Sequence, residues 1–129
     1  MLPTQIQYLV LITDNYQQAK EFYTKVLGFE IDEEVPEDEY VQFKLDNIIL
    51  AVFSRTQMSK VIDEKYLAKT GGALYTFAEV ADVDQTVADL KTKGVKFIKE
   101  PRTQPWGQRT TYFTDPDGHI WEIQKWMKK

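Results

Sequence analysis

Glu122 is the residue of this chain best suited to chemistry. It lies in a largely apolar C-terminal run of strand length, His119 to Trp126. A carboxyl among apolar side chains loses hydration, which favours its neutral form. Such a group can act as a general acid or base, or it can bind a cationic or hydrogen-bonding ligand. Glu122 is therefore the candidate catalytic residue if the protein is an enzyme.

His119 and Arg109 are the weaker candidates for proton transfer or for stabilising an oxyanion. His119 follows a tight Asp-Pro-Asp-Gly turn at 115–118, and strand alternation puts it on the opposite face from Glu122. Arg109 follows a Gly-Gln turn, where we expect it to be solvated or ion-paired. We therefore predict that His119 is a surface turn residue and that Arg109 does not stabilise an oxyanion.

Trp106 supports two interpretations. It precedes a predicted strand within the sequence Pro-Trp-Gly-Gln, where a loop can lean over a binding site. In the first interpretation the indole is a pocket wall that stacks on a planar ligand. In the second it anchors the loop between Pro105 and Gly107. The sequence leaves both open.

Composition excludes several kinds of site. The chain has 129 residues, of which 16 are basic, 20 acidic and one histidine, for a net charge of -4. The absence of cysteine excludes disulfides, thiolate catalysis and zinc fingers, and a single histidine excludes a multi-histidine metal site within one chain. No apolar run approaches the ~18 residues of a membrane span, and no basic stripe indicates a nucleic-acid surface. We expect a single cytoplasmic domain, 1–129, without membrane or nucleic-acid partners.

The elements that must position these residues form an internal repeat. In the first half, Asp14 caps a helix that Gly28 ends; in the second, Asp82 and Gly94 do the same. The strands are predicted at 6–12, from 29–31 onward, 40–45, 48–53, 73–80, 95–98, 108–113 and 119–126, with a loop holding Pro101 after the sixth. The repeat predicts an α+β fold of two βαβββ modules that form a curved mixed sheet around a concave cleft, with the helices on the outside.

The modules are expected at about 5–53 (module 1) and about 73–126 (module 2), joined by a connector at 54–72. The connector is polar and has a weak helical pattern that closes on Gly71-Gly72. It is either a plain connector with a short helix, which we favour, or a lid over a pocket.

Strand alternation predicts the wall of the cleft. We take the most uniformly apolar face to pack on the helices, which assigns Tyr8, Val10 and Ile12 to that side of the first strand. The opposite wall is mostly apolar and aromatic with a few polar groups, as in small-molecule pockets, although a second core or a dimer interface has the same composition. An error of one residue would exchange the two faces of a strand. The predicted ligand-binding residues are Gln7, Leu9, Tyr40, Phe53, Tyr75, Phe77, Trp106, Tyr112 and Glu122.

Three segments carry a family resemblance: TDNYQQAKEFYTKVLGFEI in the first half, and FAEVADVDQTVADLKTKGVKF and PWGQRTTYFTDPDGHIWEI in the second. They resemble the vicinal oxygen chelate superfamily, which includes glyoxalase I, extradiol dioxygenases, fosfomycin-modifying enzymes and bleomycin-resistance proteins. The resemblance covers roughly Gln5 to Trp126 and implies the same paired modules. Each motif alone is weak, and their combination is specific.

The resemblance also implies where a divalent metal would bind. Members usually hold it with His, Gln or Glu from the first, fourth, fifth and eighth strands, positions that here fall on Gln7, near Ala51, on Tyr75 and on Glu122. Only Gln7 and Glu122 could serve as ligands, and two such donors make a weak site. We therefore expect no cofactor and no bound metal. If a divalent metal does bind, Gln7 and Glu122 hold it, and Glu79 is the residue that could complete the site.

The resemblance leaves three functions to weigh. The first is a protein that binds a small aromatic or amphipathic molecule in an apolar cleft without a metal, as antibiotic-sequestering or sensing members do. The second is an enzyme, either a metal-dependent lyase, isomerase, transferase or dioxygenase with a degenerate site, or a metal-free catalyst using Glu122. The third is a structural subunit whose cleft its own side chains fill. Members commonly pair, and aromatic residues make up 13% of this chain, so we expect a homodimer.

Overall fold

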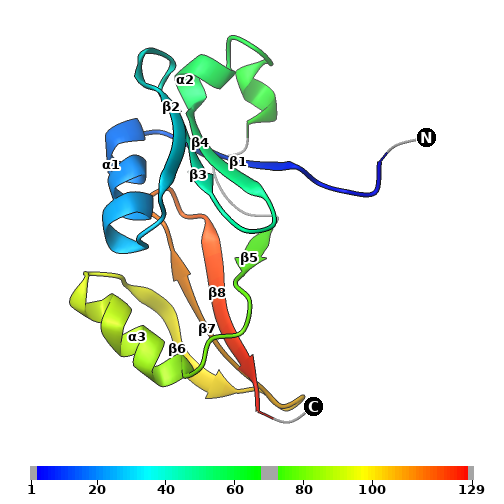
Figure 1. The fold of residues 1–129 in the computed structure, drawn as a ribbon, viewed down its shortest axis with the longest axis vertical. Helices are drawn as coiled ribbons and strands as arrows, with labels where there is room; N and C mark the ends of the chain where they lie inside the picture. The colour runs from blue at the N-terminus through cyan, green and yellow to red at the C-terminus, as the bar shows by residue number, and fades with distance from the viewer. Residues whose placement is uncertain (1–2, 68–72, 128–129) are drawn as a thin grey trace. The chain divides into compact units, whose positions relative to one another are not determined.

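The computed structural model describes residues 3–67 and 73–127 (Figure 1). It divides into two compact units, module 1 at Met1–Lys69 and module 2 at Thr70–Lys129, and the division falls within the predicted connector. Each module forms a four-stranded sheet of its own, with strand orders β1-β4-β3-β2 and β5-β8-β7-β6. The α+β class and the two βαβββ modules are confirmed. The cleft and the single-domain organisation stay predictions.

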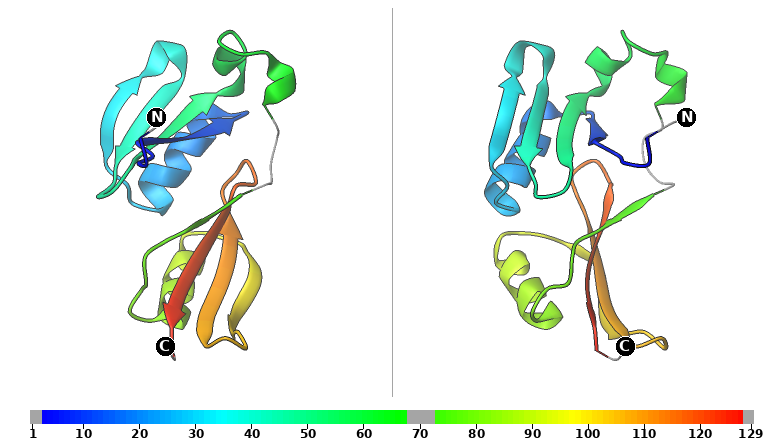
Figure 2. Two further views of the ribbon diagram at one scale, coloured as in Figure 1. Left: turned by 90° about the vertical axis from the view of Figure 1, so that its right-hand side faces the viewer. Right: turned by 45° about the vertical axis from the view of Figure 1, so that its right-hand side comes forward.

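Module 1 is built from two strands that flank a helix, followed by a hairpin and the connector. Strand β1 pairs in parallel with β4, and β3 pairs antiparallel with both β2 and β4. Helix α1 lies against one face of this sheet (Figure 2). The elements are β1 (Tyr8–Thr13), α1 (Tyr16–Glu21) with its π-helical continuation η1 (Phe22–Val26), β2 (Ile31–Val35), η2 (Pro36–Asp38), β3 (Tyr40–Lys44), β4 (Ile49–Ser54), α2 (Arg55–Met58) and η3 (Glu64–Tyr66).

The first helix begins one residue later than predicted. Asn15, not Asp14, is the N-cap, and its side chain accepts the N–H of Gln18 at 3.1 Å. The Thr13 hydroxyl fixes this cap, because it donates to the Asn15 carbonyl at 3.1 Å and accepts the Asn15 N–H at 3.0 Å. Asp14 is thereby free to pair with Arg55, whose Nε lies 2.7 Å from its carboxylate.

Module 2 repeats the order of one strand, one helix and three strands, with strands of different lengths. Asp82 caps its helix as predicted, accepting the N–H of Gln85 at 3.0 Å. The loop predicted around Pro101 is wrong, because strand β6 continues through it to Thr103. A proline is tolerated there because β6 is an edge strand and its register shifts between Lys99 and Arg102. The elements are β5 (Leu74–Thr76), α3 (Val83–Thr92), β6 (Phe97–Thr103), β7 (Gln108–Thr114) and β8 (Ile120–Trp126).

Each helix packs on one face of its own sheet. In module 1, the Tyr23 ring lies 5.6 Å from that of Phe43, and both side chains are fully buried. In module 2, the Phe113 ring lies 5.6 Å from Phe97 and 6.5 Å from Phe77. The helix side of each sheet is therefore its core side, and we call the opposite side the open face.

The predicted faces are confirmed for β3, β4, β7 and β8, and wrong for β1 and β5. In β1, Leu9 and Leu11 pair with the buried Leu50 and Val52 and so lie on the core side. Hydropathy could not distinguish the faces of β1, because both carry apolar side chains. The open face of module 1 therefore consists of Tyr8, Val10, Ile12, Tyr40, Gln42, Ile49, Ala51 and Phe53.

In β5 the two aromatic residues lie on the core side, not on the open face as predicted. The Tyr75 and Phe77 rings lie 5.2 Å and 4.9 Å from that of Trp121, which is buried. Burying two aromatic rings stabilises the module more than burying the small Thr76 and Ala78 would. The open face of module 2 therefore consists of Leu74, Thr76, Gln108, Thr110, Tyr112, Ile120, Glu122 and Gln124.

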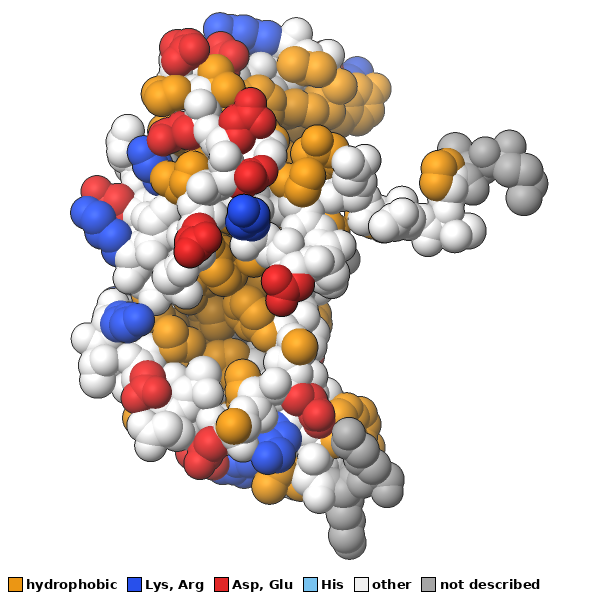
Figure 3. All heavy atoms as spheres, viewed as in Figure 1, with side chains coloured by type: hydrophobic (Ala, Val, Ile, Leu, Met, Phe, Trp, Pro, Cys, Tyr) orange, Lys and Arg blue, Asp and Glu red, His pale blue; other side chains and the backbone are white. Residues whose placement is uncertain are grey.

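The described part of the connector contains the short helix α2 and the turn η3, as the plain-connector interpretation predicts. Apolar side chains of this segment, among them Val61 and Ile62, are exposed. Figure 3 shows hydrophobic side chains gathered in several places on one face of the molecule. Gly71-Gly72 lies outside the described residues, and the lid interpretation stays a prediction. No helix in the described part of the chain has the length and hydropathy of a membrane span.

Candidate functional site

Glu122 lies in the middle of β8, on the open face of module 2, and is only 8% exposed. Thr76 is its partner in the parallel ladder to β5, and the threonine hydroxyl donates to Glu122 Oε1 at 2.7 Å. Tyr112 is its partner on the other side, in β7, so the two side chains are neighbours on the same face. The Thr76 hydroxyl thus replaces part of the water that the carboxylate has lost.

One further hydrogen bond lies beside this pair of residues. Gln104 Nε2 donates to Thr110 Oγ1 at 3.0 Å, and Thr110 lies two positions before Tyr112 on the same face of β7. Burial raises the pKa of Tyr112 above its usual value, an effect that the Thr110 hydroxyl opposes and the Glu122 carboxylate strengthens. Tyr112 therefore stays a donor at neutral pH. We call Gln104, Thr110, Tyr112, Glu122 and Thr76 the Glu122 network.

A shallow hollow of about 230 Å3 adjoins this network on the β6 side. Lys99 and Arg102 of β6 pair with Tyr112 and Thr110 in the ladder, so their side chains share the open face. Sequence reasoning missed these residues because it ended the sixth strand at Ile98. The lining residues are Lys99, Glu100, Arg102, Gln104, Thr110 and Tyr112.

Trp106 lies at the far end of the same face and is 58% exposed. Its indole N–H donates to Gln108 Oε1 at 2.9 Å, Gln108 donates to Gln124 Oε1 at 3.1 Å, and Gln124 donates to the Phe77 carbonyl at 3.2 Å. This chain of amides ties the indole to the sheet. Both interpretations of Trp106, pocket wall and loop anchor, stay predictions.

The open face of module 1 differs in character, because it is largely apolar and aromatic. Tyr40 and Phe53 pack edge to face, with ring centroids 5.5 Å apart. The Tyr40 hydroxyl donates to Gln42 at 2.7 Å, and Gln42 donates to Asp32 at 2.8 Å. Tyr8 is 49% exposed. This composition resembles that of small-molecule pockets.

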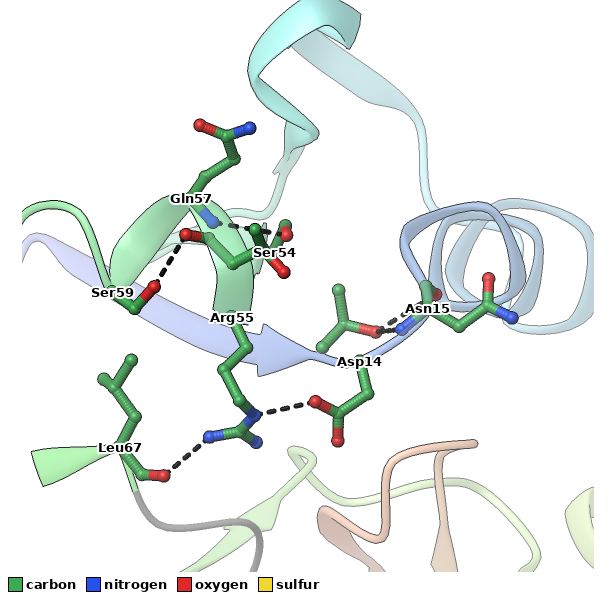
Figure 4. A network of polar contacts seen from close by, with 9 residues as sticks. Asp14, Asn15, Ser54, Arg55, Gln57, Ser59 and Leu67 are labelled. Atoms are coloured by element: carbon green, nitrogen blue, oxygen red, sulfur yellow. Dashed lines mark hydrogen bonds and ion pairs between the residues drawn. The ribbon is translucent and has the colours of Figure 1, made fainter. Parts of the chain in front are cut away.

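A second polar cluster in module 1 surrounds Arg55, at the ends of β1 and β4 (Figure 4). The guanidinium contacts Asp14 through Nε and donates from Nη1 to the Leu67 carbonyl at 2.6 Å. Its side chain is only 10% exposed. Arg55 thus holds the end of the described connector against the end of β1. The adjoining hollow, of about 570 Å3, is lined mostly by polar groups, including Glu39, Ser54 and Glu64.

Three further residues considered in the sequence, Arg109, His119 and Gln7, form contacts that belong to the fold. Arg109 forms an ion pair with Asp84 at 2.8 Å, as expected. His119 ends the 115–118 turn, where the buried Asp115 carboxylate accepts the backbone N–H groups of Asp117 and His119. Gln7 is exposed just before β1, and its carbonyl accepts the Ile49 N–H at 2.9 Å.

Comparison with known proteins identifies the family. The sequence model named Glyoxalase/Bleomycin resistance protein/Dioxygenase superfamily matches residues 5–123. The chain belongs to this superfamily. The uncharacterized protein YraH of Bacillus subtilis is 32% identical over 121 residues, spanning 91% of this chain and 94% of its own. The uncharacterized protein YaeR of Escherichia coli is 29% identical over 126 residues, spanning 88% and 90%.

Solved structures of the superfamily share the fold. A glyoxalase/bleomycin resistance protein/dioxygenase from Nocardioides superposes with a TM-score of 0.81 and 25% identity, covering 99% of this chain and 87% of its own. A lactoylglutathione lyase from Agrobacterium tumefaciens superposes with a TM-score of 0.75 and 22% identity, covering 95% and 93%. At that identity the second likeness shows the fold alone.

The superfamily's divalent metal finds few donors on the strands of this chain. In module 1, β1 pairs Tyr8 with Ile49 of β4, and neither is a ligand for a divalent metal. In module 2, β5 pairs Thr76 with Glu122 of β8, and only the carboxylate is a strong ligand. Within each module, these donors do not fit a divalent metal. Across residues 3–67 and 73–127, no group of three or more His, Asp or Glu side chains could hold a metal ion.

Three predicted ligand-binding residues of this superfamily member lie away from the open faces. Leu9 lies on the core side of β1, and Tyr75 and Phe77 pack on Trp121. We leave these three out of the site proposed below. The predicted Tyr40, Phe53, Tyr112 and Glu122 do lie on open faces. Thr76 and Thr110, which sequence reasoning missed, are visible only once the strand register is known.

Proposed function

We propose that this superfamily member binds a small amphipathic molecule on the open face of module 2, without a metal. The observation that carries the proposal is the Glu122 network. A buried carboxylate costs stability unless a donor compensates it, and here the compensation comes from the Thr76 hydroxyl on the neighbouring strand β5. A carboxylate kept at such cost on the face opposite the helix is the type of group that fixes a ligand's orientation.

The open face of module 1 is, by itself, a second candidate surface for a small molecule. Its exposed Tyr8 and Val10 and its Tyr40–Phe53 pair offer apolar and aromatic surface to a ligand. The Tyr40–Gln42–Asp32 chain adds polar groups that can orient a ligand there. A molecule with an apolar body and at least one hydrogen-bonding group matches this composition.

The ligand is tested by a small-molecule stability screen. A molecule that binds the folded state raises the unfolding temperature. We expect a hit to lose at least about ten-fold in affinity with Glu122→Gln, because the amide is neutral and can no longer make charge-assisted bonds. Glu30→Gln, an exposed carboxylate in module 1, is the matched control and should leave affinity unchanged. Hits that bind Glu122→Gln as tightly as the native protein would remove Glu122 from the site.

The absence of a metal is tested separately by elemental mass spectrometry. Protein without a His-tag is incubated with nickel, zinc, manganese, cobalt or iron(II) and desalted. We expect no retained metal, because Glu122 has no second strong ligand on its open face. Retention of about one equivalent of a single metal would overturn this part of the proposal and would direct attention to lyase, transferase or dioxygenase assays.

We also propose that the protein is a homodimer and that it is cytoplasmic. Apolar side chains such as Tyr8, Val10 and Ile31 are exposed in the single chain, and surfaces of this kind are often covered by a second copy. Light scattering coupled to size exclusion should give about twice the chain mass of 15.1 kDa. A particle of the single-chain mass at all concentrations would exclude the dimer.

A further inference from the structure

The hollow beside the Glu122 network carries a positive charge that its surroundings do not neutralise. Lys99 and Arg102 line it from β6. Glu100, the one carboxylate in the lining, already accepts both hydrogen bonds of Lys91, at 3.0 and 3.2 Å. Within the described residues, neither Lys99 nor Arg102 forms an ion pair. Two uncompensated cations on one face stand out in a chain whose net charge is -4.

Apart from Lys99, Arg102 and Glu100, the groups that line the hollow carry no charge. They are Gln104, Thr110 and Tyr112. Glu122 does not line the hollow, although it is the ladder partner of Tyr112. An anionic group can therefore approach the two cations without direct contact with Glu122.

We propose that Lys99 and Arg102 bind the carboxylate or phosphoryl group of a small organic anion in this hollow. A guanidinium and an ammonium on neighbouring ladder positions match the oxygens of such a group, the guanidinium in a bidentate manner. The volume of about 230 Å3 is below that of a drug-sized pocket, so it suits the anionic end of a ligand.

The inference deepens the proposed function, because the hollow adjoins the Glu122 network on the same open face. Anion binding in the hollow stands by itself, and only the binding of the rest of the ligand at Glu122 rests on the proposed function. The ligand is then amphipathic with an acidic end held by β6 and a donor end held by Glu122.

The test is a titration of the 15N-labelled full chain with four aromatic probes of similar size. Benzoate and phenyl phosphate carry the two anionic groups, benzyl alcohol is neutral and benzylamine is cationic. We expect saturable shifts of the backbone amides between 97 and 112 with benzoate, phenyl phosphate or both, which also decides between the two anions. Equal shifts with benzyl alcohol, or no saturable shift with either anion, would overturn the inference.

Charge-matched variants identify the residues responsible. Lys99→Gln combined with Arg102→Gln should weaken anion binding by at least about ten-fold, because two charge-assisted contacts are lost. Lys93→Gln combined with Lys96→Gln removes the same charge from exposed positions outside the hollow and should not change affinity. Equal weakening by both pairs would show a general electrostatic effect and overturn the inference.

Glu122→Gln separates this inference from the proposed function. If anion binding depends on Lys99 and Arg102 but does not change with Glu122→Gln, the anion site in the hollow is supported and the proposed binding at Glu122 is contradicted. If neutral probes bind and lose affinity with Glu122→Gln, while no anion binds at the hollow, the proposed function is supported and the anion site is contradicted.

Discussion

The Thr76 hydroxyl donates a hydrogen bond of 2.7 Å to the Glu122 carboxylate, and the two residues are direct partners in the parallel ladder between β5 and β8. The residue of β5 that faces Glu122 is therefore a hydroxyl donor and not the aromatic Tyr75. This contact explains how a carboxylate is kept on a largely buried strand position.

Replacing Thr76 should show the value of this contact. Thr76→Val removes the donor while keeping the shape of the side chain, so the free energy of unfolding should fall by about 1 kcal/mol. Thr76→Ser retains a hydroxyl and should recover most of the loss. Urea denaturation followed by tryptophan fluorescence measures both. A valine variant as stable as the native protein would show that the bond contributes nothing to stability.

The start of the first helix gives a second prediction. Asn15→Ala should lower the free energy of unfolding by about 1 kcal/mol, because the N–H of Gln18 loses its cap. Gln17→Ala, an exposed position in the first turn of the same helix, is the control and should have little effect. Thermal denaturation of the two variants checks the cap. Equal stabilities of the Asn15→Ala and Gln17→Ala variants would mean that Asn15 is not the N-cap.

Arg55 provides a third prediction, about the connector. Arg55→Met keeps the length of the side chain but leaves the Leu67 carbonyl and the Asp14 carboxylate without their donor. The cost should be about 2 kcal/mol, concentrated in residues 59–67. Hydrogen exchange of the amides of Ile62 and Leu67 should accelerate in this variant. Lys60→Met, an exposed position in the same segment, should leave their exchange rates unchanged.

The contact between α1 and β2 predicts a dependence of stability on pH. Hydrogen bonds from Lys20 and then Tyr16 hold the pKa of Glu34 below its ordinary value of 4.5. A carboxyl whose pKa is lowered by folding contributes stability above its unfolded pKa, and loses it as the pH falls through the folded value. Glu34→Gln should therefore cost about 1 kcal/mol at neutral pH and progressively less below about pH 4.5. Urea denaturation across this range measures the difference.

A control and a contrary outcome define the pH experiment. Glu37→Gln, an exposed carboxylate of η2, should show no such convergence with the native protein at low pH. A constant difference between Glu34→Gln and the native protein from neutral to acid pH would mean that folding does not lower the Glu34 pKa.

The fold could be predicted because the same local signals occur in both halves of the sequence. A capping side chain, a helix of similar length and a glycine of positive φ recur, at Gly28 (φ 78) and at Gly94 (φ 88). Only glycine adopts such a conformation without strain, so the helix ends were readable from the sequence. The extent of β6 could not be predicted from the sequence. A proline inside a strand is compatible with an edge strand, and which strand lies at the edge is a property of the whole sheet.

The candidate site was predictable only in part. Glu122 was found because Trp121 and Ile123 mark the core face of β8, and its ladder partner Tyr112 lies on the same opposite face. Thr76 was missed because three residues of β5 carry too little alternation to fix a face. Lys99 and Arg102 were missed because their register to β7 includes a shift that no sequence pattern reports.

Strand β1 can exchange its two faces with little change in the apolar surface it buries, since Tyr8, Val10 and Ile12 are as apolar as Leu9 and Leu11. The observed orientation goes with the register of β1 to β4 and with the paired hydrogen bonds of Thr13 and Asn15 at the end of the strand. A one-residue insertion or deletion in the strand would leave its apolar content nearly unchanged and place the opposite set of side chains on the open face. For this strand, residues of relatives can be compared only after their registers have been matched.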